Sequence, residues 1–528
     1  MTEQKNSLHT PLTLSLGIAI GLFIGFYFLS QKKETGADKE IQKFEQLVRL
    51  IKNEYVDTVK TSAIVEEAIR QTLNKLDPHS SYIPAEELVA MNEELNGNFE
   101  GIGIEFNIFR DTLVVVTPLS GGPSERVGLR AGDKIVKVEN KNVANVHLTN
   151  REVQKYLKGP AGTKVNLEVL RKKNTLKFTI VRNKIPQYSM DAAYMVTKDI
   201  GYIKINRFAQ TTYSEMHQAL IKLKGEGLKK LVLDLQGNSG GYLEEAIKIA
   251  DEFLPKGKKI VFTKGQEEKY NEENFATSAG DFETGELAVL VDEGSASAAE
   301  IVSGALQDND RAAIVGRRSF GKGLVQRSFA LKDGSEVRLT ISRYYTPSGR
   351  SIQKPYSNNE RYREDILQRL NHGELFHADS IKFNDSLKYK TAGGRTVYGG
   401  GGIMPDYFVP LDSAKNYRYF NELFASNALR EFAFRYGEEH KDEWKEKGYK
   451  NYCDRFIIAQ EMIRQVMAAG RKNGVKEGPR DFENNKNNIA IYLKAEIARR
   501  IWGNESFYPI YNQSNDELQK ALEVLGER

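Results

Sequence analysis

From residue 200 to residue 345, short apolar runs alternate with amphipathic segments. Apolar runs of a strand's length predict buried strands, and apolar residues at helical spacing predict helices between them. The expected strands are Ile200–Ile205, Lys230–Leu235, Leu287–Asp292 and Ala312–Val315, and the expected helices are Ser214–Lys224, Leu243–Phe253 and Ala298–Gln307. Alternating strands and helices indicate an α/β fold built on a parallel sheet.

Residues 98–184 follow a different pattern, in which short strands are separated by Gly-rich turns. Strands are expected at Thr112–Val116, Lys134–Val138, Val165–Arg171 and Leu176–Val181, with one short helix near residues 150–157. A stretch of about 85 residues has the size of an independent module, so we expect a mainly-β domain here.

Helical patterns return on both sides of these regions. Apolar residues recur at helical spacing within 39–97, and residues 413–528 also read as helices, with Ile457, Met462, Ile463 and Val466 as the expected buried set. Residues 356–396 are polar and rich in tyrosine and precede the glycine run Gly399–Gly402. We interpret them as an inserted loop.

The pattern therefore divides the chain into nine parts. They are a short N-terminal tail (1–11), an apolar segment (12–29), a linker (30–38), a helical region (39–97), the β module (98–184), the α/β core (185–355), the inserted polar loop (356–396), a return to the core (397–412) and a C-terminal helical extension (413–528).

The apolar segment Leu12–Leu29 is 18 residues long. That is close to the ~20 residues that cross a bilayer as a helix. No clear small-x-small cleavage site follows it, so we expect an uncleaved membrane anchor, with a cleaved signal peptide as the alternative. Gly17, Gly21 and Gly25 share one helix face, which permits close helix association and a homodimer, although glycine is common in such segments.

Composition excludes several classes of protein. A chain of 528 residues is longer than one hydrophobic core usually serves, so several domains are expected. The net charge is +5 and there are no long runs of like charge, so charge gives no case for nucleic acid as a partner. Cys453 is the single cysteine, and the seven histidines form no HExxH or HxH pair. We therefore expect no metal and no other cofactor.

A glycine-rich turn, Gln236–Gly241, follows the strand Leu231–Leu235. A strand that enters such a turn before a helix leaves backbone N–H groups free to face an anion. A tight turn alone would also require the glycines, so both interpretations stay open.

A second motif, Gly294–Glu300, contains Ser295 and Ser297 among small residues. A serine at a sharp turn between strand and helix is how a nucleophile is presented. Serine is also a favoured N-cap residue, so a capping role is the alternative.

The third motif, Gly316–Gly323, places Lys322 between two glycines. It resembles part of a phosphate-binding loop, but Gly323 replaces the required Ser or Thr and a strand, Leu324–Leu331, is expected where a helix should follow. A lysine held between buried strands would favour its neutral form and could act as a base. A surface lysine in a turn is the alternative. A serine and a lysine together can replace a Ser-His-Asp triad.

These motifs, taken in order, resemble those of the C-terminal processing peptidases, also called tail-specific or carboxy-terminal proteases. The matching segments are Leu76–Ser80, Gly101–Gly103, Gly128–Asp133, Asp234–Gly241, Gly294–Ala298, Gly321–Gln326, Thr346–Ile352 and Gly402–Asp406. The resemblance covers about residues 40–355 and 402–410. It implies a crotonase- or ClpP-like α/β protease core with an inserted PDZ domain, an N-terminal helical region and a C-terminal helical extension.

The resemblance also implies roles for individual residues. Ser297 would be the nucleophile, Lys322 the base, and Gln326 the residue that orients the lysine. The backbone N–H groups of Gly241 and Ala298 would form the oxyanion hole.

Residues 98–184 resemble a PDZ domain, in which a peptide is added as an extra strand and its carboxylate is held by backbone N–H groups. Gly101, Ile102, Gly103 and Ile104 match the carboxylate-binding loop. The resemblance implies that substrates are proteins or peptides with free C-terminal tails.

The chain departs from the family pattern in three places. Gln236 stands where arginine is usual, Ala299 where serine is common, and 356–396 interrupts a link that is usually short.

We therefore expect a serine endopeptidase anchored in the bacterial inner membrane by one span, with its catalytic part on the periplasmic side, or secreted if the segment is cleaved. A homodimer or a regulatory partner is also expected. The alternatives are a peptide-binding scaffold with an inactive protease domain, a crotonase-like enzyme acting on thioesters, and, more distantly, a nucleotide-driven enzyme.

Overall fold

The computed structural model describes residues 20–21, 36–119, 121–277, 280–382, 384–412 and 417–526. Its contacts divide the chain into two compact units, residues 1–76 and 77–528. The first unit contains helices α2 (Gly36–Glu54) and α3 (Thr61–Leu76), which confirms the helical pattern expected there.

The central element of the second unit is a six-stranded sheet with the order β10-β11-β12-β15-β16-β21. Its strands are β10 (Met190–Met195), β11 (Ile200–Ile205), β12 (Lys230–Asp234), β15 (Glu286–Val291), β16 (Ala313–Gly316) and β21 (Tyr407–Phe408). All neighbours are parallel except β10, which runs antiparallel to β11. The α/β core expected from the sequence is therefore present. Strands β11, β12, β15 and β16 lie within one residue of the expected positions, whereas β10 and β21 were not expected.

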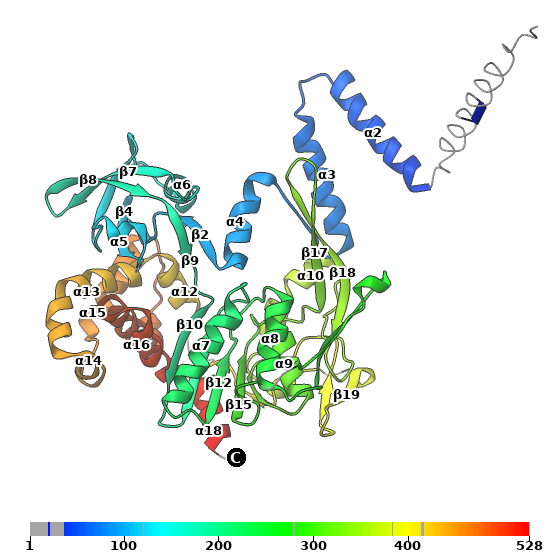
Figure 1. Ribbon diagram of the computed structural model, residues 1–528. Helices are drawn as coiled ribbons and strands as arrows, with labels where there is room; N and C mark the ends of the chain where they lie inside the picture. The colour runs from blue at the N-terminus through cyan, green and yellow to red at the C-terminus, as the bar shows by residue number, and fades with distance from the viewer. Residues whose placement is uncertain are drawn as a thin grey trace, which may run out of the picture. The chain divides into compact units, whose positions relative to one another are not determined.

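Helices cover both faces of this sheet. One face packs against α7 (Thr212–Gly225), α8 (Leu243–Phe253) and α9 (Ala298–Asp308), which lie side by side in Figure 1. The other face packs against α18 (Asp516–Gly526), whose Leu518, Ala521 and Leu525 contact Val232 and Leu290. Side chains alternate between the faces of a strand, which explains why these central strands are apolar throughout.

A second, antiparallel sheet was not expected from the sequence. It has the order β1-β18-β13-β14, and β17 pairs with β18. Its strands are β1 (Ser81–Ile83), β13 (Lys259–Gly265), β14 (Glu273–Phe275), β17 (Leu324–Ala330) and β18 (Glu336–Tyr345). Strand β17 lies where Leu324–Leu331 was expected, so the lysine motif precedes a strand and not the helix of a phosphate-binding loop.

The β module contains the sheet β3-β4-β5-β7-β8, with β6 paired to β5, and a separate ribbon of β2 and β9. Its elements are β2 (Asn98–Gly101), β3 (Ile104–Phe109), β4 (Thr112–Pro118), α5 (Pro123–Arg126), β5 (Lys134–Val138), β6 (Lys141–Asn142), α6 (Asn150–Leu157), β7 (Lys164–Arg171), β8 (Asn174–Val181) and β9 (Asn183–Pro186). Helix α4 (Ala85–Asn96) precedes the module. The mainly-β domain with one principal helix is as expected.

The segment interpreted as an inserted loop is folded. It contains α10 (Asn359–Arg363), α11 (Asp365–Asn371) and the hairpin β19 (Lys388–Lys390) and β20 (Thr396–Tyr398). Tyr362, Arg369 and Leu375 are buried. Its polar composition concealed these contacts, because charged side chains such as Arg369 and Glu374 are paired with each other in the interior.

The C-terminal extension is helical, as expected. It contains α12 (Tyr417–Ala425), α13 (Ala428–Lys447), α14 (Tyr449–Arg455), α15 (Gln460–Lys472), α16 (Asp481–Trp502), α17 (Tyr508–Tyr511) and α18. Ile463 and Val466 are buried in its core, but Ile457 is 80% exposed. The expectation for Ile457 was wrong because this residue lies between α14 and α15, outside the helical periodicity.

The expected membrane anchor requires a correction. In the part of the chain that the structure describes, no helix has the length and apolar character that a membrane span requires. Helices α13 and α16, with 20 and 22 residues, carry several charged side chains each. This finding contradicts the single-pass inner-membrane localisation. Of the segment 12–29, only residues 20 and 21 lie within the described residues.

Candidate active site

Ser297 lies at the turn between strand β15 and helix α9, where it is the N-cap residue. Its backbone has φ 55° and ψ −113°, a region that L-residues seldom adopt. Such strain persists only where surrounding contacts hold it, and it is found where a nucleophile is presented at a sharp turn. The structure thus places Ser297 at a helix cap, in a strained conformation at a sharp turn between strand and helix.

Glu300, in the first turn of α9, organises the segments that carry Ser297 and Lys322. Its Oε2 accepts the backbone N–H of Ser297 at 2.8 Å and of Lys322 at 2.9 Å. Its Oε1 accepts the N–H of Gly321 at 2.7 Å and the hydroxyl of Ser319 at 2.5 Å. The backbone N–H groups of Ser297 and Lys322 therefore donate to the same oxygen atom, which holds the two backbone segments close together.

The Glu300 side chain is fully buried, and desolvation raises its pKa to about 7 despite these four donors. The sequence analysis missed this residue because a glutamate in the first turn of a helix normally indicates only a favourable interaction with the helix dipole. The spacing Ser-x-x-Glu, which is that of a capping box, was the available signal.

Lys322 is partly buried, and the structure brings it beside the serine turn. Desolvation lowers the pKa of Lys322, whereas the charges of Glu300 and Asp77 oppose this effect and Arg338 adds to it. The hydroxyl of Tyr344 lies 2.6 Å from the carbonyl oxygen of Lys322 and 3.1 Å from that of Ser297. A lysine whose neutral form is favoured can accept a proton near neutral pH.

The glycine-rich turn is fixed against the serine turn by Asn238, which is fully buried. Its side chain donates to the carbonyl of Ile205 at 2.9 Å and accepts the N–H of Gly240 at 2.9 Å. Its backbone carbonyl accepts the N–H of Ala296 at 2.8 Å. A Cβ atom on Gly240 would lie 2.8 Å from the Cβ of Ser297, so only glycine permits this approach.

Two backbone N–H groups near Ser297 lack protein acceptors among the described residues. They belong to Gly241 and Ala298. Gly241 has φ 148°, and a Cβ there would lie 2.1 Å from the carbonyl oxygen of Phe208. The turn therefore keeps donors available at the N-terminus of α9, where the helix dipole favours negative charge.

Ser295 has a different environment. Its hydroxyl is fully buried, donates to the carbonyl of Leu235 at 2.8 Å and accepts the N–H of Asp292 at 2.9 Å. These bonds connect β12 to the serine turn. The hydroxyl of Ser295 is therefore occupied by structural contacts.

Gln326, on β17, donates to the hydroxyl of Thr340 at 3.2 Å. Thr340 in turn contacts Ser80, whose hydroxyl donates to the carboxylate of Asp77 at 2.6 Å. The motif Leu76–Ser80 is thus connected to the strand that follows Lys322. This polar chain joins segments that lie far apart in the sequence.

His79 also lies near the lysine. Its Nε2 is 2.6 Å from the hydroxyl of Tyr362 in the inserted segment. Desolvation and then the charge of Lys322 lower the pKa of His79 to about 4, so the imidazole is neutral. In the sequence, His79 stands out only as part of the segment Leu76–Ser80, and Tyr362 carries no signal.

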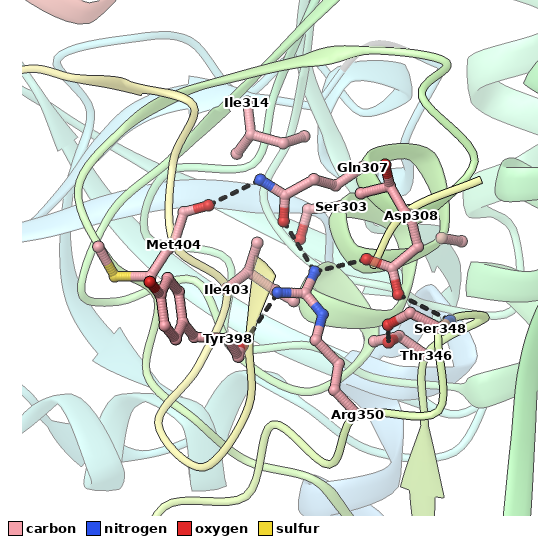
Figure 2. A network of polar contacts seen from close by, with 12 residues as sticks. Ser303, Gln307, Asp308, Ile314, Thr346, Ser348, Arg350, Tyr398, Ile403 and Met404 are labelled. Atoms are coloured by element: carbon pink, nitrogen blue, oxygen red, sulfur yellow. Dashed lines mark hydrogen bonds and ion pairs between the residues drawn. The ribbon is translucent and has the colours of Figure 1, made fainter. Parts of the chain in front are cut away.

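The far end of α9 is anchored by Arg350, whose guanidinium is fully buried (Figure 2). It donates to Gln307 at 2.7 Å, to Asp308 at 2.7 Å and to the carbonyl of Tyr398 at 3.0 Å. The other carboxylate oxygen of Asp308 accepts the N–H of Ser348 at 3.0 Å. Both ends of the helix that begins at Ser297 are therefore fixed by buried charged groups.

A groove runs along the β module. A cavity of about 1320 Å³ is lined by α4, by Gly101–Ile104 and by α6. Gly103 has φ 71°, and its N–H has no protein acceptor among the described residues. Strand β3 is the last strand of its sheet, so its outer edge is available for an added strand.

One group of side chains in the described residues has the composition of a metal site. His217, Glu252 and Asp281 place possible ligand atoms within 4.8 Å of one another. However, Nδ1 of His217 faces Glu252 at 3.4 Å, whereas Nε2 faces Asp281 at 3.7 Å, and Lys224 pairs with Asp281 at 2.8 Å. One ion could not take both carboxylates and a ring nitrogen without a rearrangement, so we interpret the group as an ion-pair cluster.

Comparisons with family models agree with this architecture. Residues 199–359 match peptidase family S41, and residues 114–171 match a PDZ domain. Residues 28–87 match the N-terminal domain of the activating protease CtpB, and residues 419–503 match a family of unknown function. The fold and these matches define a serine endopeptidase with a PDZ domain that binds peptide substrates.

Curated relatives narrow the class. The chain is 36% identical over 343 residues to the carboxy-terminal-processing protease of Bartonella bacilliformis, covering 64% of this chain and 78% of that protein. It is 34% identical over 339 residues to a probable CtpA-like serine protease of Staphylococcus aureus (strain N315), covering 63% and 67%. The chain belongs to the carboxy-terminal-processing proteases.

Solved structures include similar proteins. The photosystem II D1 C-terminal processing protease is 30% identical, with a TM-score of 0.34 and coverage of 58% of this chain and 84% of that one. The PDZ domain of a carboxy-terminal protease from Vibrio cholerae, in complex with a peptide, is 33% identical, with a TM-score of 0.16 and coverage of 17% and 97%.

Proposed function

We propose that this protease cuts protein substrates near their C-termini with a Ser297–Lys322 dyad. The observation that carries the proposal is the position of Glu300, whose carboxylate accepts the backbone N–H groups of both residues. In support, the backbone of Ser297 is held in a strained conformation, and the pKa of Lys322 is lowered by desolvation.

In the first step, the neutral amine of Lys322 takes the proton from Ser297 Oγ as the oxygen attacks the scissile carbonyl carbon. The carbonyl oxygen becomes negatively charged, and the N–H groups of Gly241 and Ala298 would donate to it. Donors of this kind typically contribute about 2.7–4 kcal/mol each to transition-state stabilisation. The tetrahedral intermediate collapses, and the ammonium of Lys322 gives its proton to the departing amine.

In the second step, water replaces the amine. Lys322 removes a proton from water, the resulting hydroxide attacks the acyl carbon, and the proton returns to Ser297 Oγ as the ester bond breaks. Nucleophile and base are regenerated, and the net reaction is hydrolysis of one peptide bond. No step requires a metal. Gln326 would act on the lysine indirectly, because its polar chain through Thr340 and Ser80 ends at Asp77, whose charge acts on Lys322.

We further propose that the PDZ domain reads the substrate's tail. The groove beside Gly101–Ile104 has the N–H of Gly103 available for an α-carboxylate, and β3 offers a free edge for the preceding residues. Recognition of a terminal carboxylate would direct cleavage to the end of the chain.

The decisive experiment compares Ser297→Ala, Lys322→Ala and Lys322→Arg with the parent protein on an unfolded protein substrate. Each variant should lose cleavage while keeping its circular dichroism spectrum, because nucleophile and base act as one unit and a guanidinium does not give up its proton near neutrality. EDTA should have little effect on the parent protein.

Ser295→Ala is the matched control. It should be less stable, because two buried hydrogen bonds are lost, but it should keep much more activity than Ser297→Ala. If Ser295→Ala were the inactive variant and Ser297→Ala the active one, the assignment of the nucleophile would be wrong.

A further inference from the structure

The inserted segment 356–396 forms hydrogen bonds and ion pairs with the residues that directly precede Lys322. Arg369 donates to the carbonyl of Arg318 at 2.5 Å and to that of Ser319 at 3.2 Å. Glu374 accepts hydrogen bonds from Arg369 at 2.8 Å and from Arg318 at 2.6 Å. Arg369 and Glu374 are buried and Arg318 is partly buried, so the insertion and the lysine loop form one packed structure.

Phe320, two positions before the lysine, packs against Tyr362 of the insertion and against Lys354, which precedes the insertion. The ammonium of Lys354 lies 3.7 Å from the ring centroid of Phe320 and 4.3 Å from that of Tyr362. The rings of Phe320 and Tyr362 meet edge to face at 5.9 Å. Asp365, also in the insertion, pairs with Lys354 at 3.1 Å.

Tyr362 connects this packed group to His79, and we call Phe320, Tyr362 and His79 together the wall. Their rings meet edge to face at 5.4 Å, and the tyrosine hydroxyl lies 2.6 Å from Nε2. Burial raises the pKa of Tyr362 and lowers that of His79, so two neutral groups share this hydrogen bond. Tyr362 is 4% exposed, so its ring lies in the interior between Phe320 and His79.

We propose that Tyr362 is a positioning residue for Lys322. Tyr362 acts through His79 and keeps water away from the lysine side of the dyad. The proposal rests on Lys322 being the base. It gives a role to the insertion, which interrupts a link that is short in the family pattern. Tyr362 touches neither the substrate nor the reacting atoms in this mechanism.

The direction of the effect follows from desolvation. An ammonium in a dry site is disfavoured, so admission of water would raise the pKa of Lys322 and leave less free amine at neutral pH. The groups whose charges act on Lys322 or on the wall beside it are Asp77, His79, Glu300, Arg338, Lys354, Asp365 and Tyr362. Of these, Glu300 also titrates near neutrality, and water would move its pKa in the opposite direction, downward.

The test is the pH dependence of kcat/KM for peptide cleavage by the full-length protein, because its acid limb reports the base of the free enzyme. Tyr362→Ala should move this limb to higher pH by about half a unit or more. Tyr362→Phe keeps the ring and should leave the limb near its parent position. Arg363→Ala, an exposed change on the same helix, is the matched control and should match the parent protein.

An unchanged limb in Tyr362→Ala, with only a lower kcat, would show that Tyr362 is merely structural and overturn the proposal. A limb that moved to lower pH would assign it to Glu300 and also overturn the proposal. If Tyr362→Ala does not fold, Tyr362→Leu keeps an apolar side chain and should give a smaller shift in the same upward direction.

The dyad variants separate this proposal from the one on which it rests. Cleavage by Lys322→Ala would remove both proposals. An inactive Lys322→Ala together with an unchanged limb in the Tyr362 variants would remove only the role of Tyr362.

Discussion

Glu300 accepts the backbone N–H of Ser297 at 2.8 Å, so the first turn of helix α9 fixes the residue that precedes the helix. The same carboxylate reaches across to the lysine loop. Glu300 was not among the expected site residues, yet it connects Ser297 and Lys322, which were. The positions of Ser297 and Lys322 depend on one buried charge.

Glu300→Gln should strongly reduce activity and stability. The glutamine side chain would place its NH₂ group against backbone N–H donors that now face a carboxylate oxygen of Glu300. Each buried donor left unpaired costs about 1–3 kcal/mol. Denaturant unfolding and kcat/KM measure the two effects. Glu336→Gln is a control, because Glu336 pairs with Arg338 on a strand outside the serine turn. Parent-like activity in Glu300→Gln would contradict the organising role of Glu300.

Stability should also depend on pH through Glu300. Burial raises its pKa in the folded protein to about 7, above the ordinary glutamate value of 4.5, so the folded state binds the proton more tightly. The contribution of this group to stability is full below pH about 4.5 and is lost as pH rises through about 7. The difference in unfolding free energy between the parent and Glu300→Gln, measured from pH 4 to 8, isolates this contribution. A difference that is constant with pH would show that the pKa is not raised.

Asn238→Ala should lower kcat more than it raises KM. The change removes the bonds that hold the glycine-rich turn beside Ser297, and an oxyanion hole contributes mainly in the transition state. We expect kcat to fall by roughly ten- to a hundredfold, which steady-state kinetics on one peptide can measure. A rise in KM alone would indicate that the turn binds substrate but does not stabilise the oxyanion.

Gly103→Ala should weaken binding of peptides with a free C-terminal carboxylate. Gly103 has φ 71°, and a Cβ there would lie 3.0 Å from Ile185 and 3.3 Å from Pro123, so the loop would have to move. Gly162→Ala is a matched control, because Gly162 has φ 86° and open space around the added atom. Fluorescence anisotropy with free-acid and amidated peptides measures the effect.

The parent protein and Gly162→Ala should both prefer the free acid, whereas Gly103→Ala should lose much of this preference. Equal affinity of the parent protein for the two peptides would remove the tail-reading proposal.

The α/β core could be predicted closely because its strands are buried on both faces and its helices have regular apolar periodicity. Strand β12 and helix α8 lie almost where the apolar pattern placed them. The antiparallel strands β13 and β18 were missed, because one of their faces is partly exposed and the apolar signal is diluted.

The candidate site was only partly predictable. Ser297, Lys322 and the glycine-rich turn carry sequence motifs, and the structure brings them to one place. Asn238 and Tyr362 make long-range contacts that no local pattern reveals, and the capping-box spacing of Glu300 does not show that its carboxylate also reaches Lys322. The polar composition of 356–396 suggested a loop, because paired charges in an interior are indistinguishable from solvated charges in a sequence.

Helix α18 covers one face of the central sheet, although it is made of residues 516–526. During synthesis the strands of that sheet emerge well before the helix that covers Val232 and Leu290. The nascent protease must therefore hold an uncovered apolar surface until residues 516–526 have been synthesised. Loss of α18 would leave Ser297 and Lys322 in the chain but expose that surface, so a product cut before residue 516 should aggregate before it could cleave anything.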